Sequence, residues 1–416
     1  MILFDRFTLD NGLQVIVHQD KTTPIVAVDL LYKVGARNEN PERTGFAHLF
    51  EHLMFDGSKN ISDFDNQLQL AGGECNAFTT NDLTNYYITL PKQNIETAFW
   101  LESDRMLELG ITKEKLEIQK DVVIEEYNQR YLNKPYGDWM LIMRYLAYRV
   151  HPYMWPTIGK DPLEIKYASL DEVNSFFYNY YAPNNAILVV AGDVETEQIR
   201  QLANKWFGPK PRRDTHIAPL PAEPEQKVAQ YLELKRNEPL NAIYRGYHMD
   251  GRMGKKYHTA DLISDILSNG ESSRLNQILV KQQKTFTNIN AYVTGEIDPG
   301  LFIIEGKLSD GVSFEQAEAS IDSVLESLWK EPIADNELTK VKNNIEVKKV
   351  VSEVNILNKA MNLAYCEMLG DANLINTEVE QYQAVTTADI AALAQELFCK
   401  NNCSTIHYKS AQTTRQ

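Results

Sequence analysis

Two histidines and a glutamate lie close together in the stretch FAHLFEHLMFDGS, residues 46–58. In a helix, residues four apart are separated by about 40° around the axis and residues three apart by about 60°, so His48, Glu51 and His52 share one face. Apolar residues fill the other faces, which predicts a helix enclosed by protein. Two imidazoles on one helix commonly begin a zinc site, and a neighbouring carboxylate that is not a ligand can act as general base. The alternative is an ordinary helix–helix contact in which all three side chains only form hydrogen bonds.

A catalytic zinc ion needs a third protein ligand and an open position for water. The helical run EKLEIQKDVVIEEYNQRY, residues 114–131, offers two adjacent glutamates. Glu126 shares its helix face with Gln119 and the apolar Val122 and Val123, whereas Glu125 is turned about 100° away. The pattern therefore favours Glu126 as the ligand. Glu125 is the alternative if the helix has another phase, and a solvated pair of charges is the simpler interpretation of both.

Length and composition predict a soluble globular protein of two domains. The chain has 416 residues, of which 43% are hydrophobic, and so many residues usually exceed one core. No uncharged apolar run is long enough for a membrane helix, and the net charge of -15 argues against a nucleic-acid partner.

The start, MILFDRFTLDNG, carries charges where a signal peptide needs its apolar core. The expected location is the cytoplasm, or the periplasm if a signal has been removed. The four cysteines are expected to be free thiols.

Helix and strand patterns divide the chain into two halves of similar plan. Residues 1–207 form the expected metal-binding peptidase domain, and residues 227–416 repeat its outline without the metal motif. Between them, residues 208–226 carry five prolines and predict a linker. Each half is expected to be an α+β domain with helices on one face of a mainly antiparallel sheet. Among the predicted helices are continuous ones at 43–57, 112–133 and 335–369.

The sequence resembles the pitrilysin/insulinase-like inverted zincins, and within them the half-length bacterial type related to the mitochondrial processing peptidase. The resemblance runs nearly end to end and is carried by LDNGLQVIV, GARNENPERTGFAHLFEHLMFDGS, GGECNAFTTNDLTNYYITLP, VVIEEYNQ, HPYMWPTIG, YYAPNNAILVVAGDV and SNGESSRLNQIL. It implies a zinc metalloendopeptidase in which His48, His52 and Glu126 hold one Zn²⁺ per chain. Glu51 would then move a proton from the attacking water to the leaving amine.

The resemblance also implies how substrate is held. An unfolded peptide would add as an extra β-strand to Asn76, Ala77, Phe78 and Thr79, which follow a pair of glycines. Without the resemblance, these four residues would be read as an ordinary internal strand.

The sequence departs from the family pattern in two ways. Gln119 stands where the family usually has a second carboxylate that supports the site, and the loss of that charge is expected to weaken metal binding. Active members also bring an Arg and a Tyr to the substrate oxyanion, yet no arginine occurs from Leu275 to Thr414, so Tyr292 lacks its companion. The expected assembly is therefore a closed chamber formed with a homologous partner subunit that supplies Arg and Tyr. A self-sufficient homodimeric peptidase and a non-catalytic scaffold subunit are the alternatives.

Overall fold

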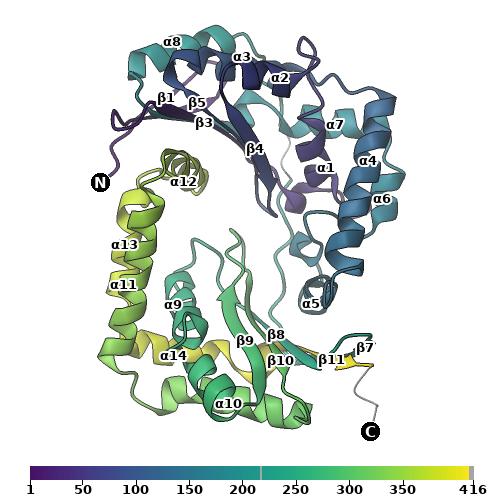
Figure 1. Ribbon diagram of the computed structural model, residues 1–416, viewed down its shortest axis with the longest axis vertical. Coiled ribbons are helices and arrows are strands. Elements are labelled where there is room, and N and C mark those ends of the chain that lie inside the picture. The colour runs from purple at the N-terminus through teal and green to yellow at the C-terminus, as the bar shows by residue number, and fades with distance from the viewer. Residues whose placement is uncertain (216–217, 412–416) are drawn as a thin grey trace. The chain divides into compact units, whose positions relative to one another are not determined.

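The computed structural model describes residues 1–215 and 218–411, which form two compact units, each built on one β-sheet (Figure 1). Of these residues, unit 1 comprises 1–129, 155–215, 218–220 and 349–377. Unit 2 comprises 130–154, 221–348 and 378–411. In this part of the chain no helix combines the length and the apolar character needed to cross a membrane.

The sheet of unit 1 has six strands in the order β1-β2-β6-β3-β5-β4. Neighbouring strands are antiparallel except β2 and β6, which run parallel. The central strands are rich in Val, Ile and Leu because both faces of the sheet are covered, whereas β4 lies at an edge and pairs only with β5. The strands are β1 (Asp5–Thr8), β2 (Gln14–Gln19), β3 (Ile25–Tyr32), β4 (Glu74–Thr79), β5 (Thr84–Pro91) and β6 (Ala186–Gly192).

Helices cover both faces of this sheet. On one face lie α3 and α8, while α12 packs against β3 and β6 on the other face (Figure 1). Ala27 and Leu31 of β3 point toward α12 and join its residues Ala360 and Leu363 in one apolar core. The helices of unit 1 are α1 (Phe46–Leu53), α2 (Phe64–Leu70), α3 (Ile95–Leu107), α4 (Lys113–Tyr127), α6 (Pro162–Lys166), α7 (Leu170–Tyr180), α8 (Thr196–Trp206) and α12 (Ile356–Met368).

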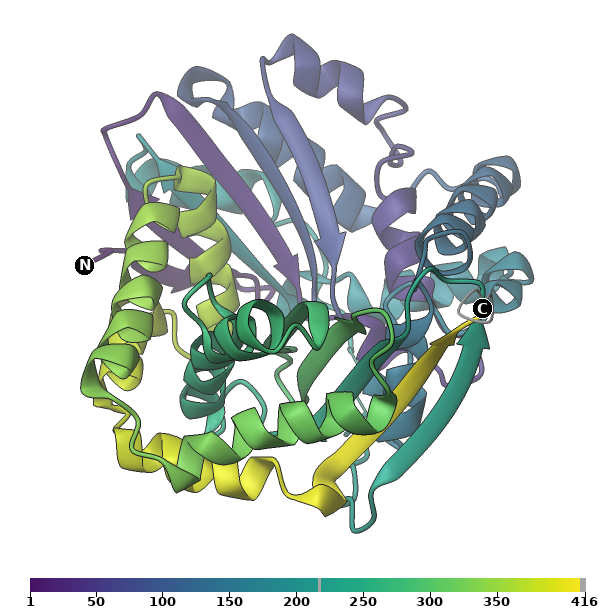
Figure 2. The ribbon, with the colours of Figure 1, turned by 60° about the horizontal axis from the view of Figure 1, so that its bottom comes forward.

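Unit 2 is built on a five-stranded sheet of order β7-β11-β8-β10-β9. Its strands are antiparallel except β7 and β11, which lie side by side in parallel (Figure 2). One face packs against α9, α10 and α14, and α5 contacts β8 and β11. The elements are α5 (Trp139–Ala147), β7 (Gln230–Arg236), β8 (Ala242–His248), α9 (Tyr257–Ser268), β9 (Phe286–Val293), β10 (Leu301–Leu308), α10 (Phe314–Lys330), α14 (Thr387–Leu397) and β11 (Cys403–Ser410). Two helices, α11 (Asp335–Ser352) and α13 (Leu374–Ala384), contain residues of both units.

Each half of the sequence contributes one helix to the sheet of the other half. Helix α5 follows α4 in the chain but packs on β8 and β11, and α12 comes late in the chain but packs on β3 and β6. Both helices present an apolar face that would suit either sheet, so nothing local in the sequence indicates which sheet each one covers.

The predicted fold class, α+β with two mostly antiparallel sheets, is confirmed. Helices cover both faces of the unit 1 sheet rather than the one face expected, and three helix boundaries are wrong. Helix α1 begins only after Gly45, whose φ of 87° suits glycine and where a Cβ would lie 2.6 Å from the carbonyl oxygen of Ile158. The helix expected at 335–369 is broken, because the Asn355 side chain accepts a hydrogen bond from the amide of Leu357 and starts α12. The helix expected at 112–133 is α-helical only to Tyr127 and continues as π-helix over Asn128–Leu132. All four cysteines are free, as expected.

Candidate active site

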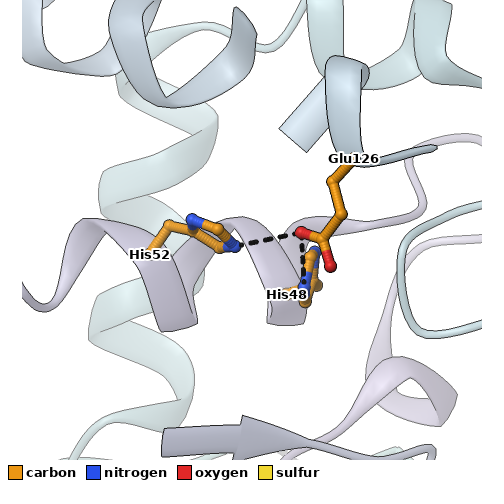
Figure 3. Close-up of side chains that lie close together, drawn as sticks. All are labelled: His48, His52 and Glu126. Carbon is orange, nitrogen blue, oxygen red and sulfur yellow. Dashed lines mark ion pairs between the residues drawn. The ribbon is translucent and has the colours of Figure 1, made fainter. Parts of the chain in front are cut away.

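Three side chains predicted to hold a metal converge in unit 1 (Figure 3). His48 and His52 project from α1, and Glu126 projects toward them from the last turn of α4. Oε2 of Glu126 lies 3.4 Å from Nε2 of His48 and 3.4 Å from Nε2 of His52. Among the described residues, this is the group of His, Cys, Asp or Glu whose ligand atoms come together closely enough, within 4.8 Å, to hold a metal ion.

The spacing of these atoms fits zinc. Bonds of about 2.0–2.1 Å in a tetrahedral site place two ligand atoms roughly 3.3–3.4 Å apart, which matches both nitrogen–oxygen distances. Two imidazole nitrogens and one carboxylate oxygen are also a usual donor set for catalytic zinc, with a fourth position left for water. Glu125 is turned away and exposed, and it accepts a hydrogen bond from Gln129.

The N-terminus of α1 is fixed by a buried carboxylate. Glu39 accepts hydrogen bonds from the backbone amides of Gly45 and Ala47 at 2.9 and 2.8 Å. These amides would otherwise be unpaired at the start of the helix. Burial raises the pKa of Glu39 to about 8, although both amide donors oppose the shift. This contact sets where α1 begins and therefore where His48 points, and sequence patterns gave no sign of it.

The chain after α1 is anchored to α3. Asp104, which is buried, accepts hydrogen bonds from the hydroxyl of Ser58 at 2.5 Å and from the amide of Asn60 at 3.0 Å. Buried carboxylates thus fix the start of α1 and the segment that follows the helix.

Glu51 points to the edge strand rather than joining the three convergent residues. Its Oε2 accepts a hydrogen bond of 2.6 Å from Oγ1 of Thr79, the last residue of β4. Along β4, exposed and partly buried side chains alternate, as expected for a strand at the edge of a sheet. The amide of Ala77 donates a hydrogen bond to Oδ1 of Asn76, its neighbour in the strand, at 2.8 Å, and Phe78 is 38% exposed.

Gln119 lies on the same face of α4 as Glu126, about two turns nearer the start of the helix, and it contacts an acid. Its Nε2 donates a hydrogen bond of 3.0 Å to Oδ1 of Asp56, just beyond α1. Burial raises the pKa of Asp56, while Gln119 and the nearby positive charge of Lys115 oppose this shift. A carboxylate is therefore present beside Gln119 on the neighbouring segment, a pairing that sequence patterns did not indicate.

In unit 2, Tyr292 has an arginine neighbour from an unexpected part of the chain. Burial raises the pKa of the Tyr292 phenol, and the charge of Arg144 on α5 partly offsets this shift. The guanidinium of Arg144, however, already donates hydrogen bonds to two other residues: to the carboxylate of Glu296 at 2.7 Å and to the carbonyl of Tyr153 at 2.9 Å. A local arginine thus exists, but its guanidinium is engaged inside the unit.

Comparison with known proteins points in the same direction as this geometry. Residues 14–137 match the model of the insulinase family of peptidases, M16, and residues 167–345 match that of the M16 inactive domain. The zinc protease PqqE of Helicobacter pylori is 30% identical over 413 residues, covering 97% of this chain and 92% of that protein. An uncharacterized zinc protease of Bacillus subtilis, YmxG, is 22% identical and covers 96% of this chain and 97% of the relative.

Solved structures show the same similarity to peptidases. A protease from Helicobacter pylori superposes with a TM-score of 0.93 at 28% identity, covering 98% of this chain and all of that one (100%). A putative M16-like peptidase from Alicyclobacillus acidocaldarius has a TM-score of 0.82 at 17% identity, with 98% and 99% coverage, and shows the shared fold. The fold and the relatives thus place the chain in the class of half-length zinc proteases. The chain belongs to the M16 peptidase family, that of insulinase and pitrilysin.

Proposed function

We propose that this chain is the zinc-binding subunit of an endopeptidase that cleaves unfolded peptides. The observation that carries the proposal is the convergence of His48, His52 and Glu126 beside an edge strand, with Glu51 hydrogen-bonded to that strand. Full-length relatives named zinc proteases support it.

His48, His52 and Glu126 are the ligands in this proposal, and one Zn²⁺ is the cofactor. Bound zinc lowers the pKa of a water molecule and polarises a carbonyl group. Glu51 acts as the general base and takes a proton from the attacking water. The same carboxyl group then carries that proton to the nitrogen of the departing amine, so the peptide bond ends as an acid and an amine.

Substrate is held on β4 by backbone pairing. The outer edge of Asn76, Ala77, Phe78 and Thr79 pairs with no strand of the described residues, and an extended peptide can add there by main-chain hydrogen bonds. A carbonyl group of the peptide would replace Oδ1 of Asn76 as the acceptor for the amide of Ala77. Because the contacts are to backbone, this mode selects unfolded substrates more than particular side chains.

A homologous partner subunit completes the enzyme in this proposal. The arginine-free stretch from Leu275 to Thr414 and the engaged guanidinium of Arg144 leave Tyr292 without a free arginine beside it. An Arg and a Tyr supplied by the partner would stabilise the developing oxyanion. An active homodimer remains the competing arrangement.

Metal analysis of single variants tests the ligand set. His48→Ala and Glu126→Ala are expected to lose bound zinc, because each removes one of three protein ligands. Glu125→Ala is the matched control, since its carboxylate lies next in sequence but faces solvent, and it should keep zinc. Zinc retained by Glu126→Ala and lost by Glu125→Ala would overturn the assignment.

A further inference from the structure

Unit 2 contains a cavity of about 500 Å³ that the proposed peptidase chemistry does not use. Its walls come from the segment before and at the start of α5 and from the strands β8, β9 and β10. The volume lies within the range of roughly 300–1,000 Å³ typical of pockets for small ligands. It can therefore take the end of a chain or a side chain, but no folded protein.

Positive charge gathers around this cavity although the whole chain carries a net charge of -15. Arg130, Lys134 and Lys307 line it, and Glu305 is the one acid among the lining residues. In the part of the chain that the structure describes, neither Lys134 nor Lys307 forms an ion pair. The charge of Lys307 acts on the carboxylate of Glu305 in the same wall. Three basic side chains against this one acid still leave a net positive charge around the cavity, which attracts an anion.

Aromatic rings form another part of the wall, beside Asn288, Pro135 and two glycines. The rings of Trp139 and Tyr244 are stacked, with centroids 4.3 Å apart and planes 10° apart. Nζ of Lys307 lies 4.6 Å from the centre of the Tyr136 ring, a cation–π contact that holds the ammonium group in place without neutralising it. The cavity thus combines fixed positive charge with flat apolar surface.

The loop that carries Tyr136 is held in one conformation. Tyr136 has a φ of 57°, in the left-handed region that a residue with a Cβ adopts only at a cost. Its amide donates to Glu238 at 2.9 Å, its hydroxyl donates to the carbonyl of Leu240 at 3.0 Å, and the amide of Leu240 returns a hydrogen bond to that hydroxyl. Strained backbone that the surroundings fix in this way is concentrated at functional sites.

From this combination we infer that the cavity is a binding site for a carboxylate of a peptide, with Lys134 and Lys307 as the groups that receive the charge. A single negative charge fits better than a phosphate dianion because Glu305, half-buried in the same wall, opposes a second one. The residue that bears the carboxylate packs its apolar part on Trp139 and Tyr244. The inference rests on the proposed function only in taking a peptide as the ligand.

Binding of short labelled peptides to the zinc-loaded Glu51→Gln chain tests this site without cleavage. One unstructured peptide without acidic residues has a free C-terminus, a second is the same peptide with a C-terminal amide, and a third is amidated but contains one internal Glu. The free C-terminus is expected to bind about tenfold more tightly than the amide at low salt, the effect of one hydrogen-bonded charge. The third peptide shows whether a side-chain carboxylate serves equally well.

The second part of the experiment removes the positive charge of each cavity lysine in turn. Lys307→Gln and Lys134→Gln should each abolish most of the advantage of the free C-terminus. Lys330→Gln is the matched control, because Lys330 is an exposed lysine of α10 paired with Glu326 and should leave both affinities unchanged. Thermal unfolding of each variant shows whether it is folded, and if one is not, the other lysine variant in the same Glu51→Gln chain decides.

Equal affinities for the free, amidated and Glu-containing peptides would overturn the inference, as would an unchanged advantage in both lysine variants. Neither result affects the metal site, which is measured by zinc content. Conversely, loss of the zinc proposal would leave the peptide comparison valid, because binding is read without hydrolysis.

Discussion

Oγ1 of Thr79, at the end of β4, donates a hydrogen bond of 2.6 Å to Oε2 of Glu51 on α1. The bond joins the strand on which the peptide is proposed to lie to the carboxylate proposed to act as base. The backbone of a peptide that pairs with β4 is therefore held in a fixed position relative to the carboxylate of Glu51, and that carboxylate keeps one orientation. Positioning of this kind is a main source of catalytic rate.

Thr79→Val should lower kcat while bound zinc stays constant. Valine keeps the branched shape that suits a strand but cannot donate to Glu51. Losing one hydrogen bond to a charged group corresponds to a fall of about 10- to 100-fold. Thr79→Ser retains the hydroxyl and should recover most of the rate. An unchanged kcat in Thr79→Val would show that the bond does not position the base.

Gln119→Glu is expected to destabilise the protein above neutral pH rather than simply strengthen the metal site. The new carboxylate would face Asp56, which Gln119 now contacts at 3.0 Å, and two adjacent carboxylates raise each other's pKa. One of them is then protonated at low pH, so stability relative to the parent chain falls as pH rises.

The exchanged pair provides the control for this prediction. Asp56→Asn combined with Gln119→Glu restores one amide and one carboxylate and should recover the parent stability. Urea unfolding at pH 5 and pH 8, with zinc affinity from a competition titration, measures both effects. A Gln119→Glu chain as stable as the parent at both pH values would contradict the contact.

Asp29 should make stability depend on pH. This carboxyl group is buried in the centre of the unit 1 sheet, where Asn85 donates to it at 2.7 Å, and burial raises its pKa to about 7. In the unfolded chain an aspartate titrates near 3.9, so the folded state holds the proton more tightly. Its contribution is therefore complete below about pH 4 and is lost as pH rises through about 7.

Asp29→Asn removes this titration and should flatten the free energy of unfolding between pH 5 and pH 8. At pH 8 the variant is expected to be more stable than the parent by on the order of 2 kcal/mol. Asp121→Asn, an exposed position on α4, is the control. A steep pH dependence that survives in Asp29→Asn would assign it to another group.

The isolated zinc-loaded chain is expected to be a poor peptidase. Loss of one oxyanion donor typically costs about 100- to 1,000-fold in rate, and Arg144 is engaged by Glu296 and Tyr153. Adding a homologous chain that carries the Arg and Tyr should restore cleavage of an unstructured peptide. Full activity of the chain alone, as monomer or homodimer, would refute the need for a partner and leave the zinc site intact.

Local pattern was enough to predict which three side chains converge in the candidate site. The spacing of His48, Glu51 and His52 defines one helix face, and helix phase favoured Glu126 over Glu125; the structure brings the two histidines together with Glu126. What sequence patterns missed depends on side-chain contacts that only the folded chain creates. Asp56 beside Gln119 and the bond from Thr79 to Glu51 join segments far apart in the sequence. Glu39 lies only six residues before Gly45, but no local pattern marks it as the acceptor for the first amides of α1.

The fold was predictable to a similar degree. Alternating and β-branched runs indicated both sheets, because such side chains suit a pleated, half-buried surface. The exchange of α5 and α12 between the two halves of the sequence was not predictable, since an amphipathic helix does not specify which apolar surface it covers. The break before α12 depends on one capping side chain, Asn355, inside a stretch that otherwise favours helix.

Zinc content and peptide cleavage measured together on Glu51→Gln test the central claim most directly. The variant, prepared with the partner that supports activity in the parent chain, should bind one zinc per chain as the parent does. Its hydrolysis should fall by at least about 100-fold, since general acid–base catalysis contributes roughly 10²–10⁴. Turnover at the parent rate with zinc bound would contradict the role of Glu51 as base.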